Sequence, residues 1–96
     1  MARYLVERLL PGITPEQLRA AATRAKETTA QMSAEGKPVR YMRSTFIPQE
    51  SKCFCLFEGP SVELIQEANE RAELPVERIV EALHIASEDL APSTVS

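Results

Sequence analysis

The chain has 96 residues, a hydrophobic content of 44% and a net charge of -3, which are ordinary values for one soluble domain. Because lysine and arginine are scattered and form no basic patch, the composition argues against binding to nucleic acids or to anionic membranes. No apolar run approaches the roughly 20 residues that cross a bilayer, and the first residues lack the apolar segment of a signal peptide. We therefore expect a cytoplasmic protein.

The first predicted strand covers residues 3–10 and stops at the Pro-Gly pair that follows it. Alternation divides its side chains between two faces. One face holds Tyr4 and Val6, and the other holds Leu5, Glu7 and Leu9. The strand is therefore predicted to be apolar on both faces, with one carboxylate interrupting the second.

A helix is predicted to begin at Thr14 and to end before Gly36. Thr14 can cap it, Pro15 suits the first helical position, and Gln17 stands where a capping box requires it. Small and apolar residues then recur at three- and four-residue spacings: Leu18, Ala21, Ala22, Ala25, Thr29 and Met32. The many alanines predict close packing of this helix against a sheet.

Residues 39–47 are rich in β-branched and aromatic side chains and predict the second strand. A short turn at residues 48–51 leads into a third strand, residues 52–58, which is apolar on both faces: Cys53, Cys55 and Phe57 on one, Phe54 and Leu56 on the other. Such a strand belongs in the middle of a sheet that is covered on both sides. We interpret the two cysteines as reduced thiols, because their Cα atoms should lie about 6.5–7 Å apart, at the outer limit of disulfide geometry.

A second helix is predicted after Ser61, which can act as its cap. Its apolar stripe comprises Val62, Ile65, Ala68, Ala72 and Leu74. Pro75 closes this helix, and the last strand is expected within residues 76–86. Residues 87–96 form a polar tail to which no structure is assigned.

This order of elements predicts a ferredoxin-like α+β domain over residues 1–86: a four-stranded antiparallel sheet, in the order 4-1-3-2, with two helices on one face. The helices can cover only one face of an inner strand that is apolar on both. Residues expected on the uncovered face are Leu5, Leu9, Phe54, Leu56, Ile79, Leu83 and Ile85. A patch of this kind marks an interface, so we expect a homodimer formed face to face. The alternative is that the tail folds over the patch.

Carboxylates interrupt the predicted uncovered face. Glu7 stands on the first strand and Glu81 on the last, and because these strands should be neighbours we expect the two side chains to be close, with Glu58 joining from the third strand. Buried carboxylates need a compensating partner. Three explanations stay open: a metal site, a proton-transfer enzyme with one neutral carboxylate, or ion pairs with Arg8, Arg40, Arg43 or Arg78.

Four further side chains have both a chemical and a structural interpretation. His84 is the only histidine, and alternation places it away from Glu81. Cys53 and Cys55 are soft metal ligands but also behave as small core residues. Tyr41 can pack or can donate a hydrogen bond in a cavity. No phosphate loop, nucleophile elbow, HExxH or EF-hand motif occurs, which argues against the familiar hydrolases, kinases and dehydrogenases.

Several short motifs together resemble a known family. They are YLVER at residues 4–8 before Pro11-Gly12, CFCLFE at 53–58, ANERA at 68–72 before Leu74-Pro75, and RIVE at 78–81. They resemble a bacterial family of small single-domain proteins, typified by a nickel-binding protein of soil actinobacteria, over about residues 3–86. The resemblance implies a ferredoxin-like dimer, nickel binding, and a site role for Glu7. Many members carry a histidine near Ala68-Asn69, where this chain has none.

The sequence thus predicts a small dimeric binding protein for a divalent transition metal, with nickel implied by the resemblance, since carboxylate oxygen and imidazole nitrogen suit such an ion. The candidate metal ligands are Glu7, Glu81, His84 and Glu58, with Cys53, Cys55 and Tyr41 as further candidates. One alternative is a cofactor-free oxygenase or isomerase acting on a small molecule, with Glu7, Tyr41 and His84 as acid or base. The other is a partner-binding module.

Overall fold

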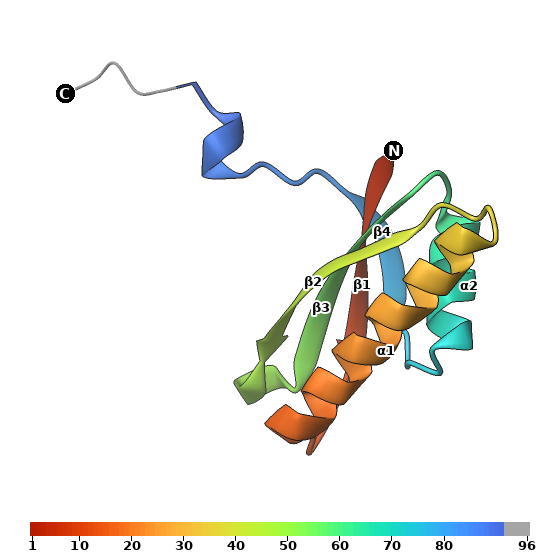
Figure 1. Cartoon of the computed structure of the whole chain (residues 1–96). Coiled ribbons are helices and arrows are strands. Elements are labelled where there is room, and N and C mark those ends of the chain that lie inside the picture. Colours follow the sequence, from red (N-terminus) through yellow and green to blue (C-terminus); the bar gives the residue numbers. More distant parts are fainter. Residues whose placement is uncertain (92–96) are drawn as a thin grey trace.

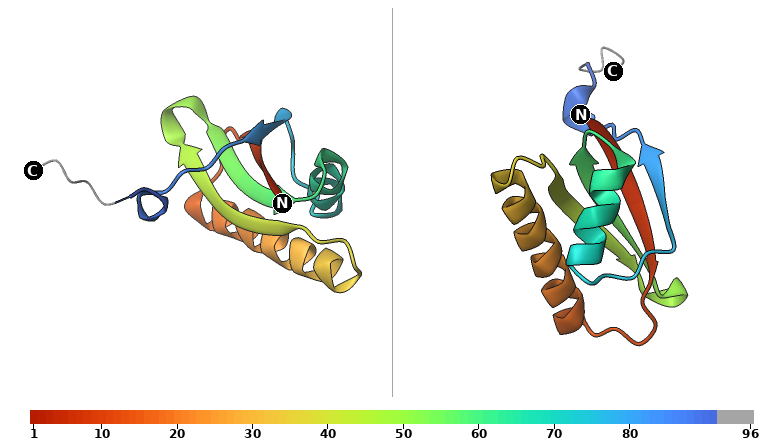
Figure 2. Two further views of the ribbon diagram at one scale, coloured as in Figure 1. Left: turned by 90° about the horizontal axis from the view of Figure 1, so that it is seen from above. Right: turned by 90° about the vertical axis from the view of Figure 1, so that its right-hand side faces the viewer.

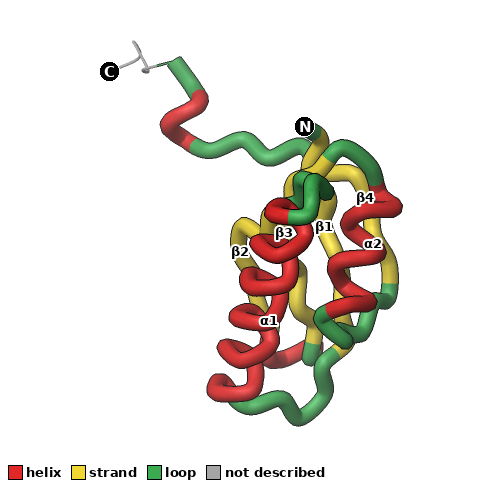
Figure 3. Tube along the Cα trace, turned by 45° about the vertical axis from the view of Figure 1, so that its right-hand side comes forward, coloured by secondary structure: helices red, strands yellow, loops and turns green. Residues whose placement is uncertain are grey.

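Residues 1–91 are described in the computed structural model, and within them the chain forms four strands and two α-helices. Their bounds are β1 Ala2–Leu9, α1 Pro15–Ala34, β2 Arg40–Ile47, β3 Lys52–Gly59, α2 Val62–Arg71 and β4 Arg78–Ala82. The strands form one antiparallel sheet in the order β2-β3-β1-β4, and both helices lie over the same face of it (Figure 1 and Figure 3). The predicted ferredoxin-like fold, with the cysteine strand inside the sheet, is confirmed.

Helix α1 begins and ends where its sequence predicts. The backbone N–H of Gln17 donates to Oγ1 of Thr14 at 3.1 Å, and the N–H of Thr14 donates to Oε1 of Gln17 at 3.0 Å, which completes the capping box. At the other end Gly36 adopts a φ of 88°, and the N–H of Lys37 reaches back to the carbonyl of Met32 at 2.9 Å. This left-handed glycine satisfies the last carbonyls of the helix.

The core lies between the sheet and the helices. Its buried members are Tyr4, Val6, Ala25, Met32, Val39, Cys53, Cys55, Phe57, Ile65, Ala68, Ala72 and Leu74. Gly59 permits a close approach of α2, because a Cβ atom there would lie 3.2 Å from Cδ1 of Ile65. Neither helix in residues 1–91 is long and apolar enough to cross a membrane.

The opposite face of the sheet carries no helix, and we name it the open face. On β1 and β3 it holds Leu5, Glu7, Phe54, Leu56 and Glu58, as the alternation predicts. On β4 the predicted assignment of side chains to the two faces of the sheet is wrong by one residue. Val6 pairs with Ile79, and Ile79 packs against the core, so Arg78, Val80 and Ala82 occupy the open face instead. Ile79 and Val80 are both apolar, so alternation alone could not fix the register, and contact with the core decides it.

The strand predicted within residues 76–86 ends early, at Ala82. Beyond it the chain leaves the sheet and runs away from the domain (Figure 1, and left view of Figure 2). Residues 83–91 contain a single helical turn, Ser87–Asp89, and at their start Leu83 and His84 line a hollow on the open face. Leu83 is 90% exposed, and Ile85 and Leu90 are each 61% exposed. The remaining predicted tail, residues 92–96, lies outside the described residues.

Candidate functional site

Glu7 lies on the open face of β1, opposite Phe54 of β3 and Arg78 of β4. The Nε–H of Arg78 donates to Oε1 of Glu7 at 3.0 Å, and Nζ of Lys52 lies 4.0 Å from Oε2. The Glu7 side chain keeps only 17% of its exposure. Of the three explanations for this carboxylate, the structure supplies the ion pair, with Arg78 as the partner.

The other two open-face candidates lie apart from Glu7. Oε2 of Glu58 is 3.4 Å from Nε of Arg3, and Oε1 is 3.6 Å from Nη2 of Arg40. Nδ1 of His84, just beyond β4, is 2.7 Å from Nη2 of Arg43. His84 and Arg43 line a hollow of about 200 Å³ on the open face, together with apolar side chains of the sheet. Each of the three open-face candidates, Glu7, Glu58 and His84, therefore already has a cationic neighbour in one protomer.

Glu81 does not join this set. It pairs with Tyr4 across β1 and β4, and Tyr4 faces the helices, so Glu7 and Glu81 lie on opposite faces of the sheet. The prediction that the two carboxylates are close is wrong, for the reason of register given above. Glu81 is also exposed, so it needs no buried partner.

No group of three histidine, cysteine or acidic side chains able to hold a metal ion is found in the part of the chain that the structure describes. The acid–base set proposed for an enzyme is divided as well. Tyr41 pairs with Phe57 on the helix-covered face, whereas Glu7 and His84 belong to the open face. One protomer therefore assembles neither a three-ligand metal site nor that set.

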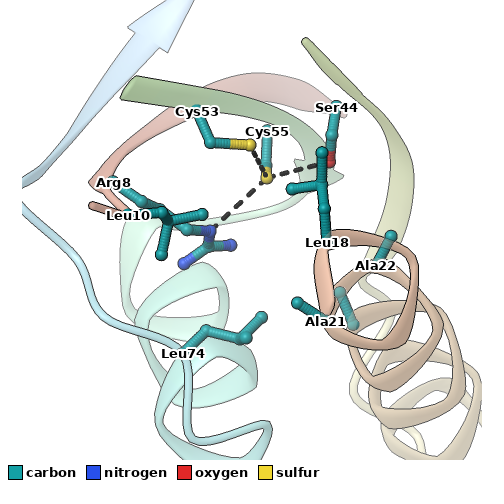
Figure 4. Close-up of a pocket in the computed structure, with 10 residues that line it drawn as sticks. Arg8, Leu10, Leu18, Ala21, Ala22, Ser44, Cys53, Cys55 and Leu74 are labelled. Atoms are coloured by element: carbon teal, nitrogen blue, oxygen red, sulfur yellow. Dashed lines mark hydrogen bonds between the residues drawn. The ribbon is translucent and has the colours of Figure 1, made fainter. Parts of the chain in front are cut away.

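The covered face holds a different cluster, which surrounds the two cysteines (Figure 4). Sγ of Cys53 lies 3.7 Å from Sγ of Cys55, and both thiols are free. Oγ of Ser44 lies 3.0 Å from Sγ of Cys55 and 2.7 Å from the hydroxyl oxygen of Tyr41. A bulge in β2 after Tyr41 shifts the alternation, so that Tyr41 and Ser44 face the same side of the sheet.

Arg8 completes this cluster from β1. Its side chain is only 2% exposed. The Nε–H donates to Sγ of Cys55 at 3.4 Å and an Nη1–H donates to the carbonyl of Pro75 at 3.0 Å, while Nη2 is buried and has no hydrogen-bond partner within residues 1–91. The suggestion that Arg8 pairs with a glutamate is wrong, because its side chain lies on the face opposite Glu7.

The contacts of the two thiols move their pKa values in opposite directions. The hydrogen bond from Cys53 lowers the pKa of the Cys55 thiol to about 6, helped by the Arg8 guanidinium and the Ser44 hydroxyl and opposed by burial. The same hydrogen bond, together with burial, raises the pKa of Cys53. Burial also raises the pKa of Tyr41, against the effect of its hydrogen bond to Ser44. The pair is thus arranged to hold one thiolate, on Cys55.

Two members of this cluster, Arg8 and Ser44, were not predicted from the sequence. Arg8 lies an even number of positions from Tyr4 and Val6, so strict alternation places its side chain on the core face. The charge of arginine, however, favours a position at the surface. Ser44 gave no comparable signal, because the bulge that turns it toward Cys55 is not visible in the alternation.

Comparisons with known proteins agree with this architecture. Residues 4–82 match the model of a family described as "Nickel responsive protein SCO4226-like". The crystal structure of SCO4226 from Streptomyces coelicolor A3(2) is similar, with 28% sequence identity and a TM-score of 0.71 over 88% of this chain and 100% of that one. No curated protein matches the chain. The family match spans most of the sequence, and the chain belongs to the SCO4226-like family of nickel-responsive proteins.

Proposed function

We propose that this protein binds a divalent first-row transition metal, nickel foremost, and that it does so in the cytoplasm as a homodimer. The observation that carries the proposal is membership of a family described as nickel responsive. A cytoplasmic setting is supported by the two free cysteines. Nickel accepts carboxylate oxygen and imidazole nitrogen together, and the affinity order of first-row ions favours it over manganese and iron.

The metal donors that we propose are His84, Glu7 and Glu58, the open-face subset of the predicted ligands. Arg78 is 64% exposed beside Glu7, and Arg40 is 63% exposed beside Glu58. Exposed ion pairs of this kind contribute at most about 1 kcal/mol, so a metal ion can displace them. A second copy doubles every donor, which lets a site draw its ligands from two chains where one chain is insufficient.

The open face is the surface that we propose for the second copy. Leu5, Phe54, Leu56 and Val80 form its apolar middle, and Val80 is 37% exposed. The ion pairs of Glu7 and Glu58 flank this middle, so both signs of charge are available to a copy related by a twofold axis. Leu83 and Ile85 extend beyond the sheet without cover from their own domain, and a second copy would cover them.

Calorimetric titration of metal-free, untagged protein with nickel tests the proposal. His84→Ala and Glu7→Gln should each weaken binding at least roughly tenfold, the usual scale for removing a supporting group at a metal site. Glu81→Gln is the matched control, because it removes the same charge from the other face and should bind like the unmodified protein. No heat above that of dilution, or equal affinity in all four proteins, would contradict the proposed site.

A further inference from the structure

Arg8 carries a buried positive charge that has no acidic partner within the described part of the chain. Every ion pair found within residues 1–91 joins other side chains, and none includes Arg8. An ionised guanidinium that is 2% exposed requires a compensating anion, since the solvation that it loses is worth several kcal/mol. The titratable group that its Nε–H contacts is the thiol of Cys55. The geometry is therefore that of an ion pair between guanidinium and thiolate.

The surroundings of Cys55 stabilise a thiolate from three strands. Arg8 of β1, Ser44 of β2 and Cys53 of β3 all lie within hydrogen-bond reach of its sulfur. Tyr41 is the remaining titratable neighbour, and it reaches the sulfur only through Ser44. The other elements that line the cavity contribute apolar side chains only: Leu10, Leu18, Ala21, Ala22, Ala25 and Leu74. No carboxylate among the lining residues competes with the thiolate for these donors.

A small cavity gives access to this sulfur. It opens between α1, the cysteine strand and the segment that follows α2, and the Arg8 side chain extends into it (Figure 4). Its free volume of about 20 Å³ holds one molecule the size of water. Arg8 lines this cavity and its Nη2 has no hydrogen-bond partner within residues 1–91, so it can donate a hydrogen bond to a small polar molecule that enters.

We propose that Cys55 is a peroxide-reactive thiolate and that Cys53 is the thiol that resolves it. The thiolate attacks one oxygen of hydrogen peroxide, the O–O bond breaks, and Cys55 becomes a sulfenic acid while the leaving oxygen takes a proton and departs as water. Cys53, 3.7 Å away, then loses its proton and displaces the hydroxyl group as water. In total two thiols and one hydrogen peroxide become one disulfide and two waters.

Arg8 has two tasks in this reaction. Its Nε–H holds the sulfur as an anion, and its free Nη2 group can donate to the peroxide oxygen on which negative charge develops. The reaction uses no metal, so it is independent of the proposed nickel site. That site lies on the opposite face of the sheet, and the two proposals can fail separately.

The test is oxidation of fully reduced protein by one equivalent of hydrogen peroxide, followed by intact mass and thiol counting. The protein should lose two hydrogens and both thiols, without a covalent dimer. At pH 7 an ordinary thiol is only about 3% ionised, so Cys55 should react at least roughly tenfold faster than free cysteine. Because the pKa of Cys55 is lowered to about 6, half of it is thiolate at that pH, and its rate should level off about one pH unit higher.

Variants separate the roles of the residues. Cys53→Ser should stop at a sulfenic acid that dimedone traps, and Cys55→Ser should form neither product. Arg8→Lys keeps a positive charge and should slow oxidation roughly tenfold, whereas Arg24→Gln, which removes a guanidinium that contacts only the carbonyl of Ala72, should not change the rate. Oxidation no faster than that of free cysteine, unaltered kinetics in Cys55→Ser, or a disulfide between two chains would overturn the proposal.

Discussion

The two faces of the sheet hold arginine in different ways. On the open face, Arg3, Arg40 and Arg78 reach carboxylates at the rim, and these arginine side chains are from 32% to 64% exposed. On the covered face, Arg8 is buried against the sulfur of Cys55 and the carbonyl of Pro75. Glu7 and Arg8 are neighbours in the chain, yet the alternation of β1 sends one to each environment.

This contrast shows how the surroundings decide what a charge does. In water the open-face pairs are screened and contribute little, so their carboxylates stay available to other cations. In the interior the guanidinium cannot be left uncompensated, and it imposes ionisation on a residue that is usually neutral. Removing a charge should therefore have very different consequences on the two faces.

The largest expected difference concerns Arg8→Ala and Arg78→Ala. The first variant leaves a cavity, an unpaired Pro75 carbonyl and a buried thiolate without its cation, so we expect the free energy of unfolding to fall by about 3 kcal/mol or more. The second loses one exposed ion pair and should change it by less than about 1 kcal/mol. Urea denaturation of both variants measures the difference, and equal losses would show that the two arginines do not differ as described.

A smaller effect is expected from pH. The folded pKa of Cys55 is about 6, below the ordinary value of about 8.5, so the unfolded chain binds more protons between these values. Stability should therefore rise with pH across this window, by about 2 kcal/mol, and be lost as pH falls toward 6. Above the window the raised pKa of Cys53 acts in the opposite direction. Urea denaturation of Cys55→Ser across the same pH range is the control, and a rise as large as that of the unmodified protein would remove Cys55 as its source.

The smallest expected effect concerns assembly. Leu83→Glu places a charge where the second copy is proposed to lie, and it should weaken the dimer roughly tenfold, or about 1.4 kcal/mol. Val76→Glu is the matched control, because Val76 is also exposed but lies on the helix side beside Val62. Light scattering over a micromolar concentration series gives both dissociation constants. A monomeric mass for the unmodified protein at these concentrations would refute the dimer.

Most of the fold follows from local signals that agree with one another. The capping box at Thr14 and the glycine at 36 set the ends of α1, and the doubly apolar strand β3 takes its place inside the sheet. The candidate site was less accessible to prediction. Adjacent apolar residues at 79 and 80 left the register of β4 open, and that single step separated Glu81 from Glu7. The interior cluster depends on a bulge and on a buried arginine, which only tertiary packing specifies.

The hydrogen-bond chain from Tyr41 through Ser44 to Cys55 has a practical consequence. The sequence contains two tyrosines and no tryptophan, so near-ultraviolet absorption and fluorescence come from Tyr4 and Tyr41. Tyr41 also meets the ring of Phe57 edge-on, with 5.6 Å between ring centroids. Its phenol therefore provides a native optical probe of the sulfur chemistry, which can be followed in unlabelled protein.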